Sequence, residues 1–181
     1  MDSQSRVAPL VVRGADNVSM STHFLTDAEA RVWCSNLGVN PDIAQFPMAS
    51  RFELPSDAGK LVALARHVWR TLIPSGGEVL VWTRDRHVFE SCEHTPAVNR
   101  WMEAFGDTRG IDDAPAMLAT AASEDDGLSL VLFAVLFVWD CWVIRSASEF
   151  VMFSHDEWFA VGPGCSGLLS DVQRFWADSK G

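Results

Sequence analysis

The stretch CWVIRSASEFVMFSHDEWFAVGP, residues 141–163, decides the fold class. It opens with two runs of β-branched and aromatic residues on either side of the polar segment RSASE (145–149), and both runs are expected to be strands. The segment WFAVGP (158–163) is a candidate third strand. Strands joined by such short turns run antiparallel, because a parallel crossover needs a dozen residues or more. The stretch therefore predicts an antiparallel sheet.

Three polar residues, His155, Asp156 and Glu157, separate the second and third of these runs. Adjacent side chains on a strand point in opposite directions, so the three do not converge on one metal ion. A chain reversal, in contrast, favours polar residues of this kind. The favoured interpretation is the turn of a hairpin. A loop that contacts a partner, and a catalytic or metal site, are the alternatives.

Helical patterns surround the predicted strands. A capping box at Thr26–Glu29 marks one helix start, and apolar residues at a 3.6-residue spacing mark others. Helices are expected over 26–37, 56–73, 95–105 and 123–138 and from residue 166 onward, and further strands over 78–83 and, more weakly, 116–121. About five helices with a small, mostly antiparallel sheet predict an α+β fold.

The most apolar run is GLSLVLFAVLFV, residues 127–138. It is shorter than the roughly 20 residues that cross a membrane, so we expect a buried helix over about 123–138 and no membrane contact. Residues 1–19 show no periodicity and are expected to be a poorly ordered extension. Residues 20–181 are expected to form a single globular domain.

Charge and composition narrow the class of partner. The chain carries 24 acidic and 14 basic residues, a net charge of −10, which disfavours nucleic acid and suits a basic protein partner. It has eight Trp and no Tyr. Most of these Trp are expected in the core and some at a partner surface. Its four cysteines form no Cys-x-x-Cys pair and no signal peptide is visible, so reduced thiols and a cytoplasmic location are expected.

No phosphate-loop, dinucleotide, nucleophile-elbow or zinc-protease motif is present, and no cofactor or metal is expected. The segment WTRDRHVFESCEH (82–94) contains Cys92 and His94, which are candidates for a metal site or a nucleophile pair, but a charged loop is the favoured interpretation. Asp140 follows the apolar run. It is expected to be a helix terminus, a buried carboxylate paired with Arg145, or an acid with a raised pKa.

These observations predict a non-enzymatic, acidic, cytosolic protein-binding domain, for example an immunity protein or antitoxin that neutralises a basic partner. The expected contact residues are Asp156, Glu157, Trp158, Asp85 and Glu90. One alternative is an enzyme whose site is assembled from His87, His94, Asp140 and His155. Another is a structural component of a phage or secretion assembly.

Overall fold

A computed structural model gives the fold of the chain and describes residues 23–40, 50–73, 77–86 and 94–177. These residues form one seven-stranded antiparallel sheet and five α-helices, so the predicted α+β class is confirmed. The strands are β1 (His23–Leu25), β2 (Ser50–Glu53), β3 (Glu78–Arg84), β4 (Ala116–Thr120), β5 (Asp140–Ile144), β6 (Phe150–Ser154) and β7 (Trp158–Val161). The helices are α1 (Asp27–Asn36), α2 (Ala58–Leu72), α3 (Thr95–Ala104), α4 (Glu124–Leu136) and α5 (Ser166–Ala177).

The strands follow the order β1-β4-β3-β5-β6-β7-β2 across the sheet. The stretch 141–163 supplies β5, β6 and β7, which are neighbours in both the chain and the sheet, as its pattern predicts. The first two strands of the described residues, β1 and β2, lie at opposite edges. The sequence pattern predicts neither of them, because three or four residues are too few to show an alternation of apolar and polar side chains.

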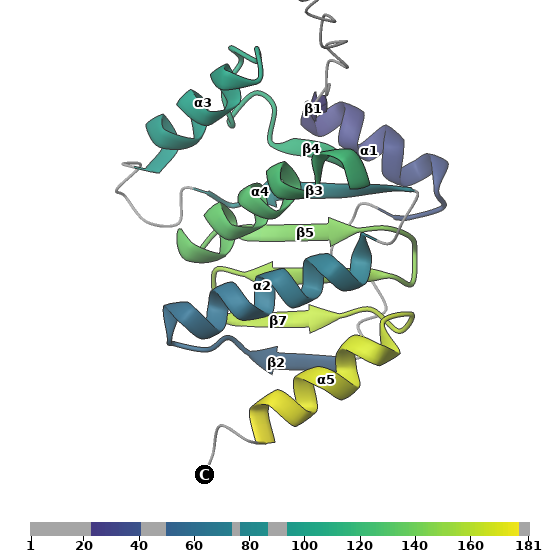
Figure 1. The fold of residues 1–181 in the computed structure, drawn as a ribbon. Coiled ribbons are helices and arrows are strands. Elements are labelled where there is room, and N and C mark those ends of the chain that lie inside the picture. Colours follow the sequence, from purple (N-terminus) through teal and green to yellow (C-terminus); the bar gives the residue numbers. More distant parts are fainter. Residues whose placement is uncertain (1–22, 41–49, 74–76, 87–93, 178–181) are drawn as a thin grey trace, which may run out of the picture.

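Helices lie on both faces of the sheet (Figure 1). α2, α4 and α5 cover one face, where Trp69, Leu130 and Leu168 belong to a single buried cluster. α1 covers part of the other face, where Cys34 packs in a second cluster with Trp82. Since successive strand residues point to opposite faces, each central strand contributes to both clusters. The side chains of β3, for example, divide between the two clusters as Val79 and Val81 on one face and Leu80 and Trp82 on the other.

The predicted apolar helix is α4, which packs directly against α2. Gly127 allows the close approach, because a Cβ atom at this position would lie 2.1 Å from Cη2 of Trp69. Leu130, Val131 and Ala134 continue the buried side of the helix. Among the described residues, no helix has both the length and the apolar character that a membrane crossing requires.

α4 ends in a left-handed residue that leads into β5. The N–H of Trp139 donates to the carbonyl of Ala134 at 2.8 Å, as in a Schellman motif, and Val138 takes the position after the C-cap with a φ of 57°. Glycine is the usual residue there, because a β-branched side chain is strained at positive φ. The backbone is therefore under local strain at Val138, two residues before Asp140.

α3 contacts the rest of the fold through aromatic side chains. Trp101 lies between Phe24 of β1 and Phe133 of α4, with ring centroids 5.5 and 5.6 Å apart. Phe137 continues this row at 5.7 Å from Phe133 and stacks on His94 at 4.0 Å. The aromatic row ties the edge of the sheet to the end of α4 at which the left-handed turn occurs.

Candidate functional site

Four chain segments meet at one end of the sheet, on the left of Figure 1. The strand registers place them together: Arg84 at the end of β3 faces Asp140 at the start of β5, and Trp158 at the start of β7 faces both Ser154 and Glu53. We call this region the acidic end, because it presents the exposed carboxylates of Glu53, Asp85, Asp156 and Glu157.

A buried carboxylate lies at the centre of the acidic end. Asp140 is only 4% exposed, and its Oδ1 accepts hydrogen bonds from the backbone N–H of His155 at 2.8 Å and from Nδ1 of the same residue at 2.9 Å. Arg145, the expected partner, instead pairs with Glu149 at 3.3 Å. Asp140 therefore anchors the β6–β7 turn to the start of β5.

The predicted turn at His155–Glu157 is present between β6 and β7. Glu157 has a φ of 62°, its N–H donates to the carbonyl of Ser154 at 3.1 Å, and its own carbonyl accepts from the N–H of Leu54 at 2.8 Å. The N–H of Asp156 lies 3.3 Å from the hydroxyl of Ser154. The backbone is thus held on both sides, while the carboxylates of Asp156 and Glu157 face solvent.

Trp158 differs from the two acidic residues before it. Its side chain is half-buried, and the guanidinium of Arg51 lies 3.9 Å from its ring centroid. One face of the indole is therefore already covered by a cation within the chain.

Asp85 is exposed at the end of β3, with a φ of 43°, and Glu90 lies outside the described residues.

The tryptophans lie mostly in the core, as the favoured interpretation predicts, and the smaller number expected at the surface is not found among the described residues. Of the seven whose side chains the structure describes, none is exposed. Four are buried: Trp69, Trp82, Trp139 and Trp142. Three are half-buried: Trp33, Trp101 and Trp158. Trp158 is the half-buried indole at the acidic end, and Arg51 already covers one of its faces.

Two of the four residues proposed for an assembled catalytic site come together. Asp140 and His155 are in contact, and Nε2 of His155 lies 3.5 Å from a carboxylate oxygen of Asp156. His94 stacks on Phe137, while His87 and Cys92 lie outside the described residues. Within the described ranges, no group of three or more His, Cys, Asp or Glu side chains has the arrangement of a metal site.

The cysteines that the structure describes are buried free thiols, Cys34, Cys141 and Cys165. Burial raises the pKa of Cys34 to about 11 and raises the pKa of Cys141 further still. Thiols of this kind remain protonated at neutral pH and are poor nucleophiles. Their environment is that of structural core residues.

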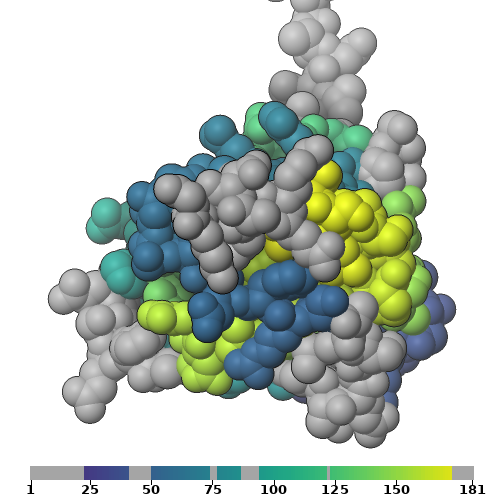
Figure 2. All heavy atoms as spheres, turned by 90° about the horizontal axis from the view of Figure 1, so that it is seen from below, coloured from purple at the N-terminus to yellow at the C-terminus, as the bar shows by residue number. Residues whose placement is uncertain are grey.

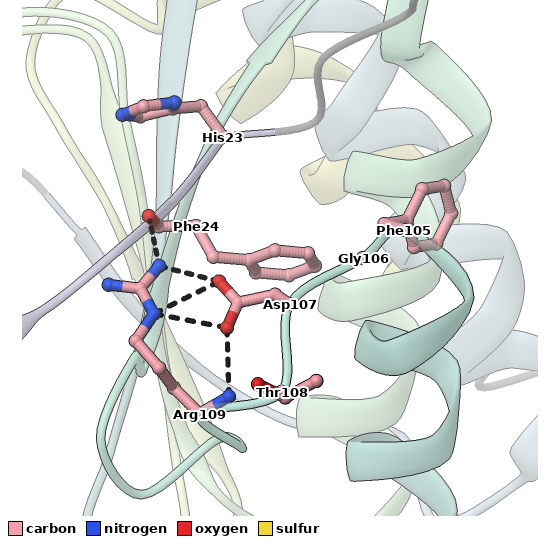
Figure 3. Close-up of a pocket in the computed structure, with 7 residues that line it drawn as sticks. All are labelled: His23, Phe24, Phe105, Gly106, Asp107, Thr108 and Arg109. Atoms are coloured by element: carbon pink, nitrogen blue, oxygen red, sulfur yellow. Dashed lines mark hydrogen bonds and ion pairs between the residues drawn. The ribbon is translucent and has the colours of Figure 1, made fainter.

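A separate depression of about 370 Å³ lies at the opposite edge of the sheet, between β1 and residues 105–109 (Figure 3). Its main polar feature is Arg109, which donates to Asp107 at 2.5 Å and to the carbonyl of Phe24 at 2.9 Å. This bond lowers the pKa of Asp107 and raises the pKa of Arg109. The sequence analysis did not predict this cluster, and the segment DTR (107–109) is its only local signal.

Arg109 has a structural role in that depression. The carboxylate of Glu29 lies 4.0 Å from its guanidinium. The guanidinium is engaged by Asp107 on one side and by the carbonyl of Phe24, at the edge of β1, on the other (Figure 3). Such a group closes a strand edge rather than offering free donors to a ligand. The acidic end is therefore the stronger candidate for a functional surface.

Comparisons with protein-family models, with curated proteins and with solved structures found no match for this chain. A functional assignment therefore depends on the chain's own residues and their geometry.

Proposed function

We propose that this chain is a non-enzymatic protein-binding domain that uses its acidic end to recognise a basic protein. The observation that carries the proposal is the β6–β7 turn. Asp156 and Glu157 are exposed there, and the turn backbone is held by the hydrogen bond from the N–H of His155 to Asp140. Pre-organised charges lose little conformational entropy on binding. A net charge of −10 adds attraction at long range and speeds the encounter with a basic partner.

Further carboxylates extend this surface on both sides. Glu53 lies on β2 next to the turn, and Asp85 lies beyond β5 at the end of β3. Asp85 and Glu157 both have left-handed backbones, and left-handed residues other than Gly concentrate at functional surfaces. A basic segment that crosses the ends of β2, β7, β6, β5 and β3 would meet these charges in turn.

An immunity protein or antitoxin in the cytoplasm fits such a surface. A protein of this kind must bind its basic toxin rapidly, and complementary charges raise the association rate. A structural component of a phage or secretion assembly remains the alternative within the same binding class. Stable high-order oligomers of the purified chain would favour that alternative.

The contact between Asp140 and His155 also supports a second candidate, an enzyme that uses His155 as a general base. A carboxylate bound to one imidazole nitrogen orients the ring so that the other nitrogen accepts a proton. The adjacent residue in the chain, Ser154, does not supply a hydroxyl for such a base, because it is 3% exposed and already accepts the N–H of Asp156. Among the described residues, the contact is better explained as an anchor for the turn.

The test is capture of partners from the native host, with the tagged chain as bait and mass spectrometry as readout. The bait is compared with a charge-reversed variant, Asp156→Lys with Glu157→Lys. The matched control is Glu78→Lys with Glu103→Lys, which makes the same change in net charge at two exposed residues outside the acidic end. We expect a basic protein to be captured by the wild type and the control and to be lost from the first variant.

Equal loss in both variants would show that only the net charge matters and would contradict the site assignment. Absence of any stoichiometric basic partner, at low as well as high salt, would contradict the protein-binding function itself.

A further inference from the structure

Among the described strands, β2 is the outermost at one edge of the sheet and has a single neighbour, β7. In an antiparallel pair, alternate residues bond to the neighbouring strand. Leu54 donates its N–H to Glu157 at 2.8 Å, so Phe52, two residues earlier, also bonds to β7, and the backbone groups of Arg51 and Glu53 point outward. No described residue pairs with these outward groups. Figure 2 looks onto this edge, where the atoms of β2 lie near the centre of the face, beside α5.

The two edges of the sheet differ in whether a described residue bonds to the outward backbone groups of the edge strand. At the β1 edge, the outward carbonyl of Phe24 is occupied by Arg109. At the β2 edge, Arg51 and Glu53 are exposed. The guanidinium of Arg51 lies over the ring of Trp158 in the same chain, and neither Arg51 nor Glu53 forms an ion pair with a described residue. An unpaired strand edge is a template for pairing with another chain.

The sequence of β2, Ser-Arg-Phe-Glu, is complementary to itself when two copies run antiparallel. A two-fold axis at Phe52 places Arg51 opposite the partner's Glu53 and Glu53 opposite the partner's Arg51. Both are pairs of outward residues, so each pair exchanges two backbone hydrogen bonds as well as opposite charges. The two Phe52 residues meet at the axis, in the position between the hydrogen-bonded pairs.

Other registers lack this agreement between charge and hydrogen bonding. An axis at Arg51 sets two guanidinium groups opposite each other, and an axis at Glu53 sets two carboxylates opposite each other, both of which are unfavourable. An axis between two adjacent residues would oppose outward groups with inward ones. The charges on β2 therefore disfavour unspecific pairing and select one register.

We propose that two copies of this chain associate through their β2 edges, with Phe52 at the two-fold axis, to form one continuous antiparallel sheet. The occupant of the edge is a second copy because the order of charges on β2 complements its own reverse. An interface of this kind is isologous and closes as a dimer.

The first test measures the association state of the full chain by sedimentation across a dilution series. We expect a concentration-dependent dimer. Arg51→Glu or Glu53→Arg alone makes both cross-strand pairs repulsive and should weaken the dimer about tenfold or more. The exchange of both residues, Arg51→Glu with Glu53→Arg, restores both attractions and should restore the dimer.

Arg145→Glu is the matched control, since it produces a like-charge pair with Glu149 within one chain and away from β2. It should leave the dimer unchanged. A wild type that stays monomeric throughout, or a double exchange that fails to recover association, would overturn the proposal.

Amide exchange of the wild type provides a test that needs no variant. Phe52 and Leu54 donate to β7 in every state, so their exchange should not depend on concentration. The amides of Arg51 and Glu53 become bonded only between copies, and their exchange should slow as the protein is concentrated. If the exchange of these two amides is independent of concentration, the proposed pairing is wrong.

Discussion

Asp140 and His155 are linked twice through one oxygen atom, since Oδ1 of Asp140 accepts both the backbone N–H and Nδ1 of His155. The carboxylate is nearly buried, whereas the imidazole is partly exposed. The hydrogen bond from the backbone N–H to the carboxylate holds the turn independently of the imidazole side chain. This relationship gives the acidic end its shape.

Replacement of Asp140 by Ala should destabilise the protein by about 2–3 kcal/mol, because the N–H of His155 loses its acceptor in a largely buried position. Asp140→Asn keeps an acceptor oxygen and should cost clearly less. The free energy of unfolding from urea titration distinguishes the two variants. Equal losses would mean that the N–H of His155 does not depend on that oxygen.

Val138→Gly should stabilise the protein by about 1 kcal/mol. The φ of 57° strains a β-branched residue, and glycine removes the strain at the position where Schellman motifs usually carry it. Leu136→Gly, at the last residue of α4 and without a positive φ, serves as the control and should destabilise the helix. Thermal unfolding of both variants checks the prediction, which fails if Val138→Gly lowers the melting temperature.

Gly127→Ala should destabilise the protein by about 1–3 kcal/mol, because the new methyl group would overlap the ring of Trp69 and lie 2.8 Å from Cβ of Ala119. Gly167→Ala in α5 makes the same chemical change with no atom within 4 Å, and should be neutral or slightly stabilising. Chemical denaturation of the two variants gives the comparison. Similar stabilities would show that α2 and α4 separate easily.

The buried thiols should make the protein less stable at alkaline pH. The pKa of Cys34 rises from its ordinary value of 9.0 to about 11 in the folded chain, so above pH 9 the unfolded chain loses this proton first. The stabilising contribution is complete below pH 9 and disappears as the pH rises to about 11. Cys34→Ala should flatten the decline in unfolding free energy over this interval, and an unchanged slope would contradict the assignment.

The parts of the fold that follow from the sequence are those with long, regular patterns. The three-strand stretch 141–163 and the apolar helix α4 are visible because many residues repeat one period. β1 and β2 are not visible, since their stability comes from pairing with distant strands rather than from their own residues.

In the candidate site, too, the local features follow from the sequence, whereas the contacts between distant residues do not. The turn at Asp156 and Glu157 follows from local composition, as polar residues between two strands. The bond from Asp140 to His155 joins residues 15 apart, and the bond from Arg109 to Phe24 joins residues 85 apart. Contacts of this kind depend on strand register, which a single sequence does not specify.

The order of the strands also determines when the sheet can be completed during synthesis. β2 leaves the ribosome before its neighbour β7, which is the last of the described strands, so residues 50–53 lack this neighbour until residues 158–161 follow. The β5–β6–β7 meander assembles locally, and β2 then closes the far edge as a late step with a large loop-closure entropy. A nascent chain that stalls before β7 would expose an unpaired β2 together with the apolar partners of Phe52, and would be a natural substrate for chaperones.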